Sequence, residues 1–175
     1  MDFQTLEADL VSEPITGYLH TGQRLHVPLV SHVVDNLYVG GHSDHADLGD
    51  FFTHVFSLYV WGRQYTTHDD TKHASVRMFD SPDEDTSLVD QIVSDVVLAL
   101  EEGGNVLVHC QAGINRSNLV AALALRQWKN MTSQEAITLL RERRSPLILA
   151  NRSFESYLLG LDNLQARVDY PGDGG

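Results

Sequence analysis

The segment that most constrains the fold is a short apolar run, followed by a small polar loop and a long apolar stretch. The run at 105–109 comes after a helical pattern that ends at Gly103-Gly104. Its short length and lack of alternation predict a buried parallel strand. The stretch at 117–129 predicts an apolar helix. A strand, loop and helix in this order are typical of α/β proteins, in which helices cover a largely parallel sheet.

The rest of the chain supplies further strands and helices for such a sheet. Runs rich in Val, Leu, Phe and Tyr predict strands at 25–34, 37–39, 54–60 and 76–79. Apolar residues recur every four positions across 88–100, which predicts a helix. Thr132 and Glu135 form a capping box for a helix that continues to about Arg144, and Asn151 can cap a last helix. Together these elements predict a three-layer α/β sandwich with a mixed, mostly parallel central sheet covered by helices.

A chain of 175 residues is long enough to bury one core and leaves little room for a second domain. We place the domain at 25–166, an extension packed on or beside it at 1–24, and a flexible tail at 167–175. The single cysteine excludes an internal disulfide framework. The first twelve residues are acidic, unlike a signal peptide, and no apolar run is long enough to span a bilayer. We therefore expect a soluble monomer that is cytoplasmic, or alternatively nuclear, with no membrane partner.

Charge is distributed unevenly along the chain. The sequence has 24 acidic and 12 basic residues, a formal net charge of −12, which argues against a nucleic-acid partner. Seven of the 12 basic residues nevertheless lie within 111–152. This concentration is compatible either with an anionic ligand in that region or with solvated helix faces.

The loop between the buried strand and the apolar helix has the composition of a phosphate-binding nest. Only five residues separate Cys110 from Arg116, so the backbone N–H groups of the loop can converge on one point in front of the helix N-terminus. Gly113 permits a backbone conformation that a side chain would obstruct. The guanidinium of Arg116 can hold two phosphate oxygens in a bidentate arrangement. The sequence therefore predicts that this loop binds a phosphate group.

The same environment favours the thiolate form of Cys110, which would then be a nucleophile directed at the bound phosphorus. The hydroxyl of Ser117 is placed to bond the sulfur and help it leave in a second step. His109 is expected to orient the loop by hydrogen bonding rather than to take part in the chemistry. A lone cysteine is usually buried and inert, but His, Cys, Gly, Arg and Ser rarely occur together at this spacing by chance, so the sequence favours the reactive cysteine.

These residues resemble a known family. Cys110, Gly113, Arg116 and Ser117 match the Cys-x5-Arg-Ser/Thr signature of cysteine-dependent protein tyrosine phosphatases, in the form most like the dual-specificity phosphatases. The segment 36–41 is similar to the "LYLG" strand of that family. Arg141, Arg144, Asn151 and Phe154 are similar to its Arg-x-x-Arg and Asn-x-x-Phe segments. The resemblance covers about residues 25–165 and implies a protein tyrosine phosphatase-like fold.

The resemblance also implies site residues and a reaction. It makes Cys110, Arg116, Asp80 and Ser117 the catalytic residues, with Asp80 as the acid that protonates the leaving oxygen. Asp83 is the second candidate for the acid. The substrate phosphate would be bound by the loop residues Gln111, Ala112, Gly113, Ile114, Asn115 and Arg116, with His109 as structural support.

The expected activity is removal of phosphate from phosphotyrosine, and also from phosphoserine and phosphothreonine, in a protein substrate through a cysteinyl-phosphate intermediate. No cofactor and no metal site are expected. The loop has Asn115 where the family commonly has Ser, a feature similar to RNA 5′-triphosphatases of the same superfamily. An RNA 5′-phosphatase, a phosphoinositide phosphatase and a non-catalytic phosphoprotein-binding module therefore remain alternatives.

Several neighbouring side chains have two interpretations from sequence alone. Arg144 is either a contact for a second phosphate or an exposed cation at a helix C-terminus. Trp61 and Arg63 either line the rim of the pocket or pack elsewhere. Asp85 is expected to cap the helix that begins near Thr86, and Glu84 to lie in a solvated turn.

Overall fold

The computed structural model describes residues 14–61, 65, 67–81 and 86–169 of the chain, and its centre is a five-stranded sheet with the order β3-β4-β7-β5-β6. β3 and β4 are antiparallel, whereas the pairs β4–β7, β7–β5 and β5–β6 are parallel. The strands are β3 (Val30–Val34), β4 (Leu37–Gly40), β5 (His54–Ser57), β6 (Lys72–Ser75) and β7 (Val106–His109). The mixed, mostly parallel sheet predicted from the sequence is thus confirmed.

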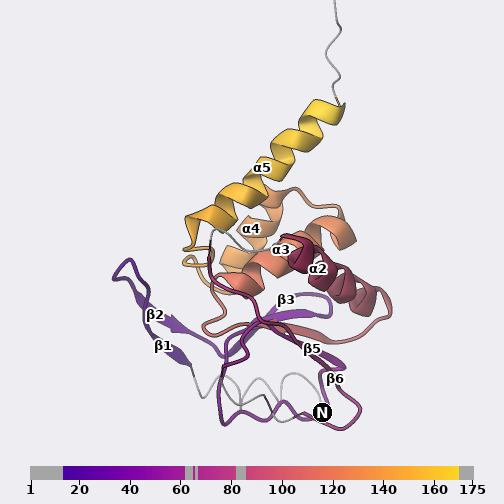
Figure 1. The fold of residues 1–175 in the computed structure, drawn as a ribbon. Helices are drawn as coiled ribbons and strands as arrows, with labels where there is room; N and C mark the ends of the chain where they lie inside the picture. The colour runs from indigo at the N-terminus through magenta and orange to yellow at the C-terminus, as the bar shows by residue number, and fades with distance from the viewer. Residues whose placement is uncertain (1–13, 62–64, 66, 82–85, 170–175) are drawn as a thin grey trace, which may run out of the picture.

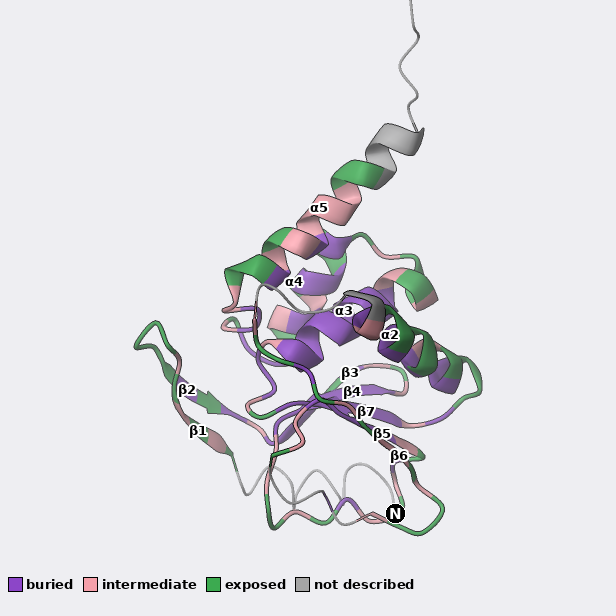
Figure 2. Ribbon diagram, viewed as in Figure 1, coloured by how far each residue is buried: buried purple, intermediate pink, exposed green. Residues whose placement is uncertain are grey.

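The described helices all lie on one face of this sheet (Figure 1). They are α2 (Thr86–Glu101), α3 (Arg116–Lys129), α4 (Ser133–Arg143) and α5 (Arg152–Asp169). β7 and the first ten residues of α3 are buried throughout, so both ends of the loop between them are anchored in the core (Figure 2). α4 begins with the predicted capping box, because the Thr132 hydroxyl accepts from the Glu135 N–H and the Glu135 carboxylate accepts from the Thr132 N–H.

The second face of the sheet has its own small core. In the described part of the chain, irregular segments rather than helices cover this face. The buried residues of this core are Leu29, Val30, Tyr38, Leu48, Phe52, Val55, Tyr65 and Leu107. No helix within the described ranges combines the length and the apolar character needed to cross a membrane.

The position of β6 differs from the sequence prediction. β6 occupies 72–75, whereas the strand was predicted at 76–79. β6 lies at the edge of the sheet and is only partly buried, so it can accommodate the mostly polar sequence Lys-His-Ala-Ser. The apolar residues at 76–79 follow it as an irregular segment that leads towards Asp80.

A two-stranded antiparallel hairpin precedes the sheet. It consists of β1 (Ile15–Tyr18) and β2 (Arg24–Val27) and projects from the body of the molecule (Figure 1). The segment predicted as one continuous strand at 25–34 is divided between β2, which begins one residue earlier at Arg24, and β3, whereas β1 lies in the predicted extension at 1–24. The side chain of Ile15 packs into the space that the missing Cβ of Gly41 leaves open. This contact fixes the base of the hairpin next to the end of β4.

Candidate active site

The loop from Cys110 to Asn115 connects β7 to α3 and is built around one glycine. Gly113 has a φ of +66°, a conformation that L side chains rarely adopt. A Cβ at this position would lie 2.5 Å from the carbonyl oxygen of Gly40. Both the backbone conformation and the close approach of β4 therefore require glycine, as the sequence predicted.

Four successive carbonyl groups of the loop are held away from the pocket. The carbonyl of Gln111 accepts from the His42 N–H at 2.9 Å, and that of Ile114 accepts from the Leu149 N–H at 2.9 Å. The carbonyls of Ala112 and Gly113 accept from the Arg144 guanidinium at 3.2 and 2.7 Å.

This arrangement determines where the loop's N–H groups point. The C=O and N–H of one trans peptide unit point in opposite directions, and no peptide bond among the described residues is cis. The N–H groups that follow these four carbonyls, those of residues 112–115, therefore face the pocket. Convergent N–H groups in front of a helix N-terminus form a binding site for an anion.

The position of Arg144 differs from both interpretations of the sequence. It is neither a contact for a second phosphate nor an exposed cation, because its side chain is buried behind the loop. Besides the two loop carbonyls, its Nη1 donates to the carbonyl of Pro28 at 2.9 Å and to the hydroxyl of Ser31 at 3.0 Å. Burial lowers the pKa of Arg144 to about 10, so the guanidinium stays protonated at neutral pH. Arg144 thus braces the loop from behind.

Cys110 begins the loop and lines the pocket with its neighbours. Its Sγ lies 3.4 Å from the hydroxyl oxygen of Ser117, as the sequence predicted for a residue that assists the sulfur. Its backbone N–H donates to the carbonyl of Gly40 at 3.3 Å. Cys110 is the single cysteine of the sequence, and its side chain is buried.

Arg116, the first residue of α3, brings a second source of positive charge to the pocket. Its Nη1 donates to the carbonyls of Leu58 and Met78 at 3.1 and 3.0 Å, which anchors the guanidinium between the segments after β5 and β6. Its buried Nε has no hydrogen-bond partner among the described residues. A buried donor without a partner costs free energy, so this N–H is available to an anion in the pocket.

Asp80 lies at the rim of the same pocket and is held by two amide side chains. Asn115 donates from Nδ2 to one carboxylate oxygen at 2.7 Å, and Asn151 donates to the other at 2.8 Å. The side-chain oxygen of Asn115 in turn accepts from the backbone N–H of Asn151 at 3.0 Å. Asn115, which departs from the common family residue, therefore joins the loop, the acid and the start of α5 in one network.

Sequence reasoning missed that Asn115 and Asn151 both bind Asp80. Asn151 was interpreted as a helix cap and as part of the family's Asn-x-x-Phe segment, and its side-chain oxygen does accept from the Ser153 N–H at 3.1 Å. Its amide nitrogen binds Asp80 at the same time. The departure of Asn115 from the family's serine was the one signal in the sequence that pointed to this arrangement.

His109 lies beneath the loop, in the position expected for structural support. Its Nε2 is hydrogen-bonded to the Ser57 hydroxyl, which also bonds Nε2 of His73 at 2.7 Å. Its ring packs edge-on against Tyr65 with the centroids 4.7 Å apart. Burial, together with the charges of His42 and His73, lowers the pKa of His109 to about 3, so the ring is neutral at physiological pH.

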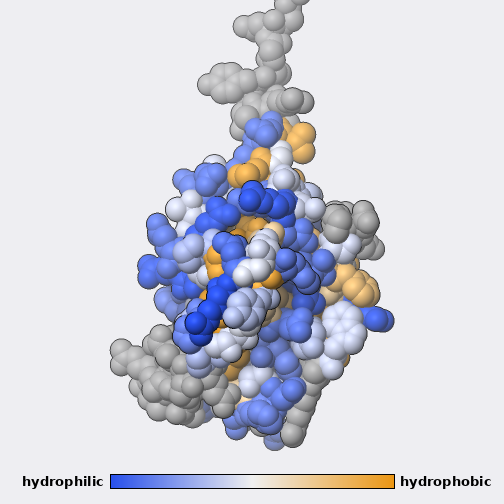
Figure 3. All heavy atoms as spheres, turned by 90° about the vertical axis from the view of Figure 1, so that its left-hand side faces the viewer, coloured by the Kyte–Doolittle hydropathy of each residue, from blue (hydrophilic) through white to orange (hydrophobic). Residues whose placement is uncertain are grey.

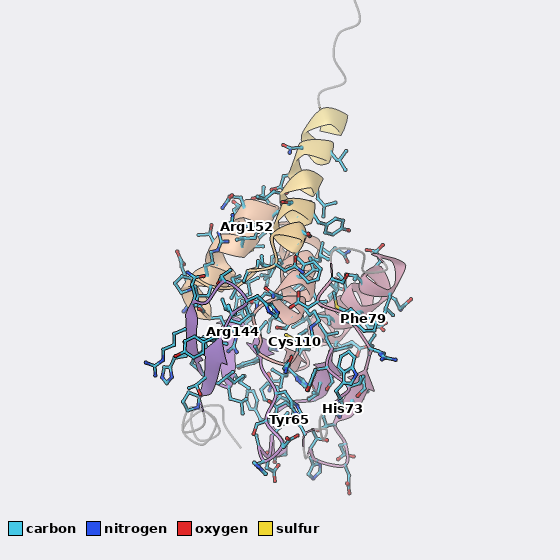
Figure 4. All side chains as sticks on the ribbon, turned by 60° about the vertical axis from the view of Figure 1, so that its left-hand side comes forward. Tyr65, His73, Phe79, Cys110, Arg144 and Arg152 are labelled. Carbon is cyan, nitrogen blue, oxygen red and sulfur yellow. The ribbon has the colours of Figure 1, made fainter. Side chains whose placement is uncertain are left out.

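Two adjoining cavities border the loop. The first has a volume of about 380 Å³ and is lined by Cys110, Arg116, Asp80 and the hairpin residues 15–20. The second, of about 220 Å³, lies between residues 19–21 of the hairpin and Ala150-Asn151 and shares the lining residues Asp80 and Asn115. The N-terminal extension predicted at 1–24 thus contributes one wall of the site. Figure 4 shows Cys110 near the centre of the molecule, between Arg144 and Phe79.

The remaining candidates fall partly outside the described residues. Asp83, Glu84, Asp85 and Arg63 belong to segments that the structure does not describe, as do 1–13 and 170–175 of the predicted extension and tail. Trp61 is half-exposed beside Phe79. Within the described ranges, no group of three or more His, Cys, Asp and Glu side chains is arranged to hold a metal ion.

Comparisons with known proteins identify the family of this chain. The family model of the dual specificity phosphatase catalytic domain matches residues 37–163. Human dual specificity protein phosphatase 26 is 36% identical over 93 residues, which are 52% of this chain and 43% of that protein. Rat dual specificity protein phosphatase 5 is 30% identical over 129 residues, 70% of this chain and 33% of that protein. The chain thus spans less than half the length of these relatives.

The fold is also found among solved structures. The crystal structure of human DUSP28 superposes with a TM-score of 0.66 at 21% identity and covers 78% of this chain and 99% of that one. The family model covers most of the sheet and of α2–α5, whereas β1, β2 and β3 precede the matched segment. From the loop, its surroundings and these matches, the chain belongs to the dual specificity phosphatase catalytic-domain family.

Proposed function

We propose that this protein is a phosphatase that hydrolyses phosphotyrosine, and also phosphoserine and phosphothreonine, in protein substrates through a cysteinyl-phosphate intermediate. The observation that carries this proposal is the outward orientation of the four loop carbonyls, which directs the N–H groups of residues 112–115 towards the pocket that Cys110 lines. Membership of the family supports the same reaction.

In the first step, the loop N–H groups and the unpartnered Nε of Arg116 bind the phosphate oxygens. The thiolate of Cys110 attacks phosphorus, forming an S–P bond as the P–O bond to the substrate breaks. The departing oxygen takes a proton from Asp80, which lines the same cavity. The products of this step are the dephosphorylated side chain and the cysteinyl phosphate.

In the second step, a water molecule attacks phosphorus and gives its proton to the Asp80 carboxylate. The S–P bond breaks and inorganic phosphate forms. The Ser117 hydroxyl, 3.4 Å from Sγ, donates a hydrogen bond to the sulfur as it leaves as thiolate. Asp80 is protonated again at the end of the cycle and ready for the next substrate.

The composition of the pocket favours a phosphoprotein over the alternative substrates. Residues 111–115 carry no cationic side chain, and a headgroup with several phosphates would need additional positive charge there. Arg144, a candidate for a second phosphate, is occupied behind the loop. The net charge of −12 disfavours a polyanion such as RNA. A non-catalytic binding module is disfavoured because nucleophile, arginine and acid are all present at the pocket.

The test is a comparison of wild type and Cys110→Ser on an aryl phosphate, with and without a metal chelator. We expect hydrolysis that is insensitive to the chelator and abolished by the substitution, while the variant still binds a phosphopeptide. Undiminished turnover by Cys110→Ser would refute the mechanism. Parallel rates on a phosphotyrosine peptide, a phosphoserine peptide, a triphosphorylated RNA and a phosphoinositide would rank the substrate classes.

A further inference from the structure

An exposed group of two aromatic rings and one guanidinium lies beside the phosphate pocket. Trp61 and Phe79 are large apolar side chains with 49% and 50% of their surface exposed. Their ring centroids lie 5.7 Å apart at an interplanar angle of 61°. The guanidinium carbon of Arg77 lies 5.3 Å from the centroid of Trp61 and 5.2 Å from that of Phe79. We call these three residues the aromatic–arginine patch.

The patch is continuous with the catalytic pocket. The ring of Tyr59 lies 5.6 Å from that of Trp61, and the guanidinium carbon of Arg116 lies 5.8 Å from the Tyr59 centroid. Phe79 directly precedes Asp80, which lines the pocket. In Figure 4, Phe79 and Arg144 lie on opposite sides of Cys110. These two contacts place the Trp61 ring within about 11 Å of the Arg116 guanidinium. An extended polypeptide rises about 3.3 Å per residue, so a chain anchored in the pocket reaches the patch within about three to four residues.

The sheet explains why these side chains meet. β5 and β6 are parallel neighbours, so the segments that follow them leave the same edge of the sheet at which the catalytic loop follows β7. Trp61 comes from the segment after β5, and Arg77 and Phe79 come from the segment after β6. Binding sites in parallel sheets form at this edge.

The chemistry of the patch is that of a peptide-binding surface. Aromatic residues and arginine are enriched in the energetically dominant parts of protein interfaces. The rings hold the Arg77 guanidinium by cation–π contacts, and its planar N–H groups can still donate to a carboxylate. Lys and Arg are sparse in this half of the chain, since 1–110 contains only four of the 12. Figure 3 shows that the visible surface is mainly hydrophilic, with hydrophobic side chains near the centre of that face.

We propose that the aromatic–arginine patch binds the substrate polypeptide beside its phosphorylated residue and selects an acidic side chain there through Arg77. The argument for this occupant is local charge complementarity: Arg77, held by the two rings, supplies a fixed cation next to the pocket, and an acidic side chain beside the phosphorylated residue complements it. The inference rests on the proposed phosphatase function and adds the sequence preference of the substrate.

The experiment uses three substrates: a small aryl phosphate, a phosphotyrosine peptide with Glu at the second to fourth positions on one side, and the same peptide with Gln instead. We expect wild type to prefer the Glu peptide about tenfold in kcat/KM. Arg77→Gln is expected to reduce this preference to about one and to keep aryl phosphate turnover within about twofold. Trp61→Ser is expected to lower kcat/KM for both peptides, because both lose the apolar contact.

Two control variants match these changes. Lys72→Gln removes an exposed cation from β6, the strand that precedes Arg77, and Leu98→Ser removes a side chain that is 55% exposed on α2. Neither is expected to change the preference. As a further test, Arg77→Glu with a Lys-flanked peptide is expected to restore efficient turnover by reversing both charges.

The proposal is overturned if wild type does not distinguish the Glu and Gln peptides, or if Arg77→Gln lowers all three rates equally. It is also overturned if sedimentation shows a dimer that Trp61→Ser dissociates, because the patch would then bind a second copy of the chain. Each result leaves the phosphatase mechanism intact as long as aryl phosphate turnover requires Cys110. Loss of that requirement would instead refute the proposed function.

Discussion

Asn115 provides the sharpest test of how the site positions its acid. The substitution Asn115→Ala removes the amide that donates to Asp80 at 2.7 Å and the oxygen that accepts from the Asn151 N–H at 3.0 Å. It leaves the donor from Asn151 to Asp80 at 2.8 Å. The carboxyl group would then be held at one oxygen instead of two, and it would occupy the position for proton transfer less of the time.

The magnitude follows from these contacts. Asp80 is protonated when it acts as the acid, and a hydrogen bond between neutral groups contributes about 0.5–1.5 kcal/mol. A loss of about 1.4 kcal/mol corresponds to a tenfold lower rate. Removal of the acid itself by Asp80→Asn is expected to cost about 10²–10⁴-fold. Asn115→Ala should therefore lower the same rate as Asp80→Asn, but by a smaller factor.

The assay is kcat across aryl phosphates whose leaving groups differ in basicity. A basic leaving oxygen needs the proton and a weakly basic one does not, so Asn115→Ala is expected to slow phenyl phosphate about tenfold and nitrophenyl phosphate little. Asn115→Ser, with the common family residue, has a shorter side chain and is expected to behave similarly. In the Asp80→Asn background, Asn115→Ala should add almost nothing.

Two results would refute this reasoning. An equal loss for all leaving groups would indicate damage to the loop rather than to proton transfer. Full additivity of the two substitutions would show that Asn115 acts independently of Asp80.

Three further predictions concern stability and redox chemistry. Gly113→Ala is expected to destabilise the fold by about 2 kcal/mol or more in denaturant unfolding and to abolish turnover, because the new Cβ meets Gly40 and the φ is +66°; a fully active variant would contradict the proposed loop geometry. Burial alone would raise the pKa of Asp162, but hydrogen bonds, chiefly from Ser133, lower it from 3.8, so its stabilisation exists above pH 4 and is lost as the pH falls through the lower folded-state value. The stability difference between wild type and Asp162→Asn should therefore shrink between pH 6 and pH 3, and a constant difference would refute the assignment. Peroxide is expected to convert Cys110 to a sulfenic acid or a backbone sulfenamide, because the chain has no second thiol; mass spectrometry should find at this loop the gain of one oxygen for the sulfenic acid or the loss of two hydrogens for the sulfenamide.

The parts of this structure that sequence could predict are those governed by local pattern. The strand–loop–helix unit around Cys110 combines a continuous apolar run, a glycine and an apolar helix within 25 residues, and all three appear as predicted. The capping box at Thr132 and the four-residue periodicity of α2 likewise depend on neighbours in the sequence. Periodicity and capping are short-range signals, and they identify such elements well.

The parts that could not be predicted depend on contacts between distant residues. β6 is polar because it lies at the edge of the sheet, and only its pairing with β5 makes Lys72–Ser75 a strand. β1 is a four-residue strand with a half-exposed pattern, so its sequence does not distinguish it from a loop. An arginine after a helix, such as Arg144, normally indicates a solvated helix end. Arg144 is instead buried and supports the loop, because Pro28 and the catalytic loop pack around its guanidinium.

The bracing by Arg144 also has a consequence for biosynthesis. The Arg144 guanidinium joins the catalytic loop to Pro28 and Ser31. These two residues precede Arg144 by 116 and 113 positions in the sequence. Contacts of such long range form late in folding, because a large loop must close before they are made. A nascent chain that has emerged from the ribosome only as far as α3 already contains the whole loop but lacks its support. We therefore expect the growing polypeptide to bind no phosphate until residue 144 has emerged, so that phosphate affinity reports completion of the fold.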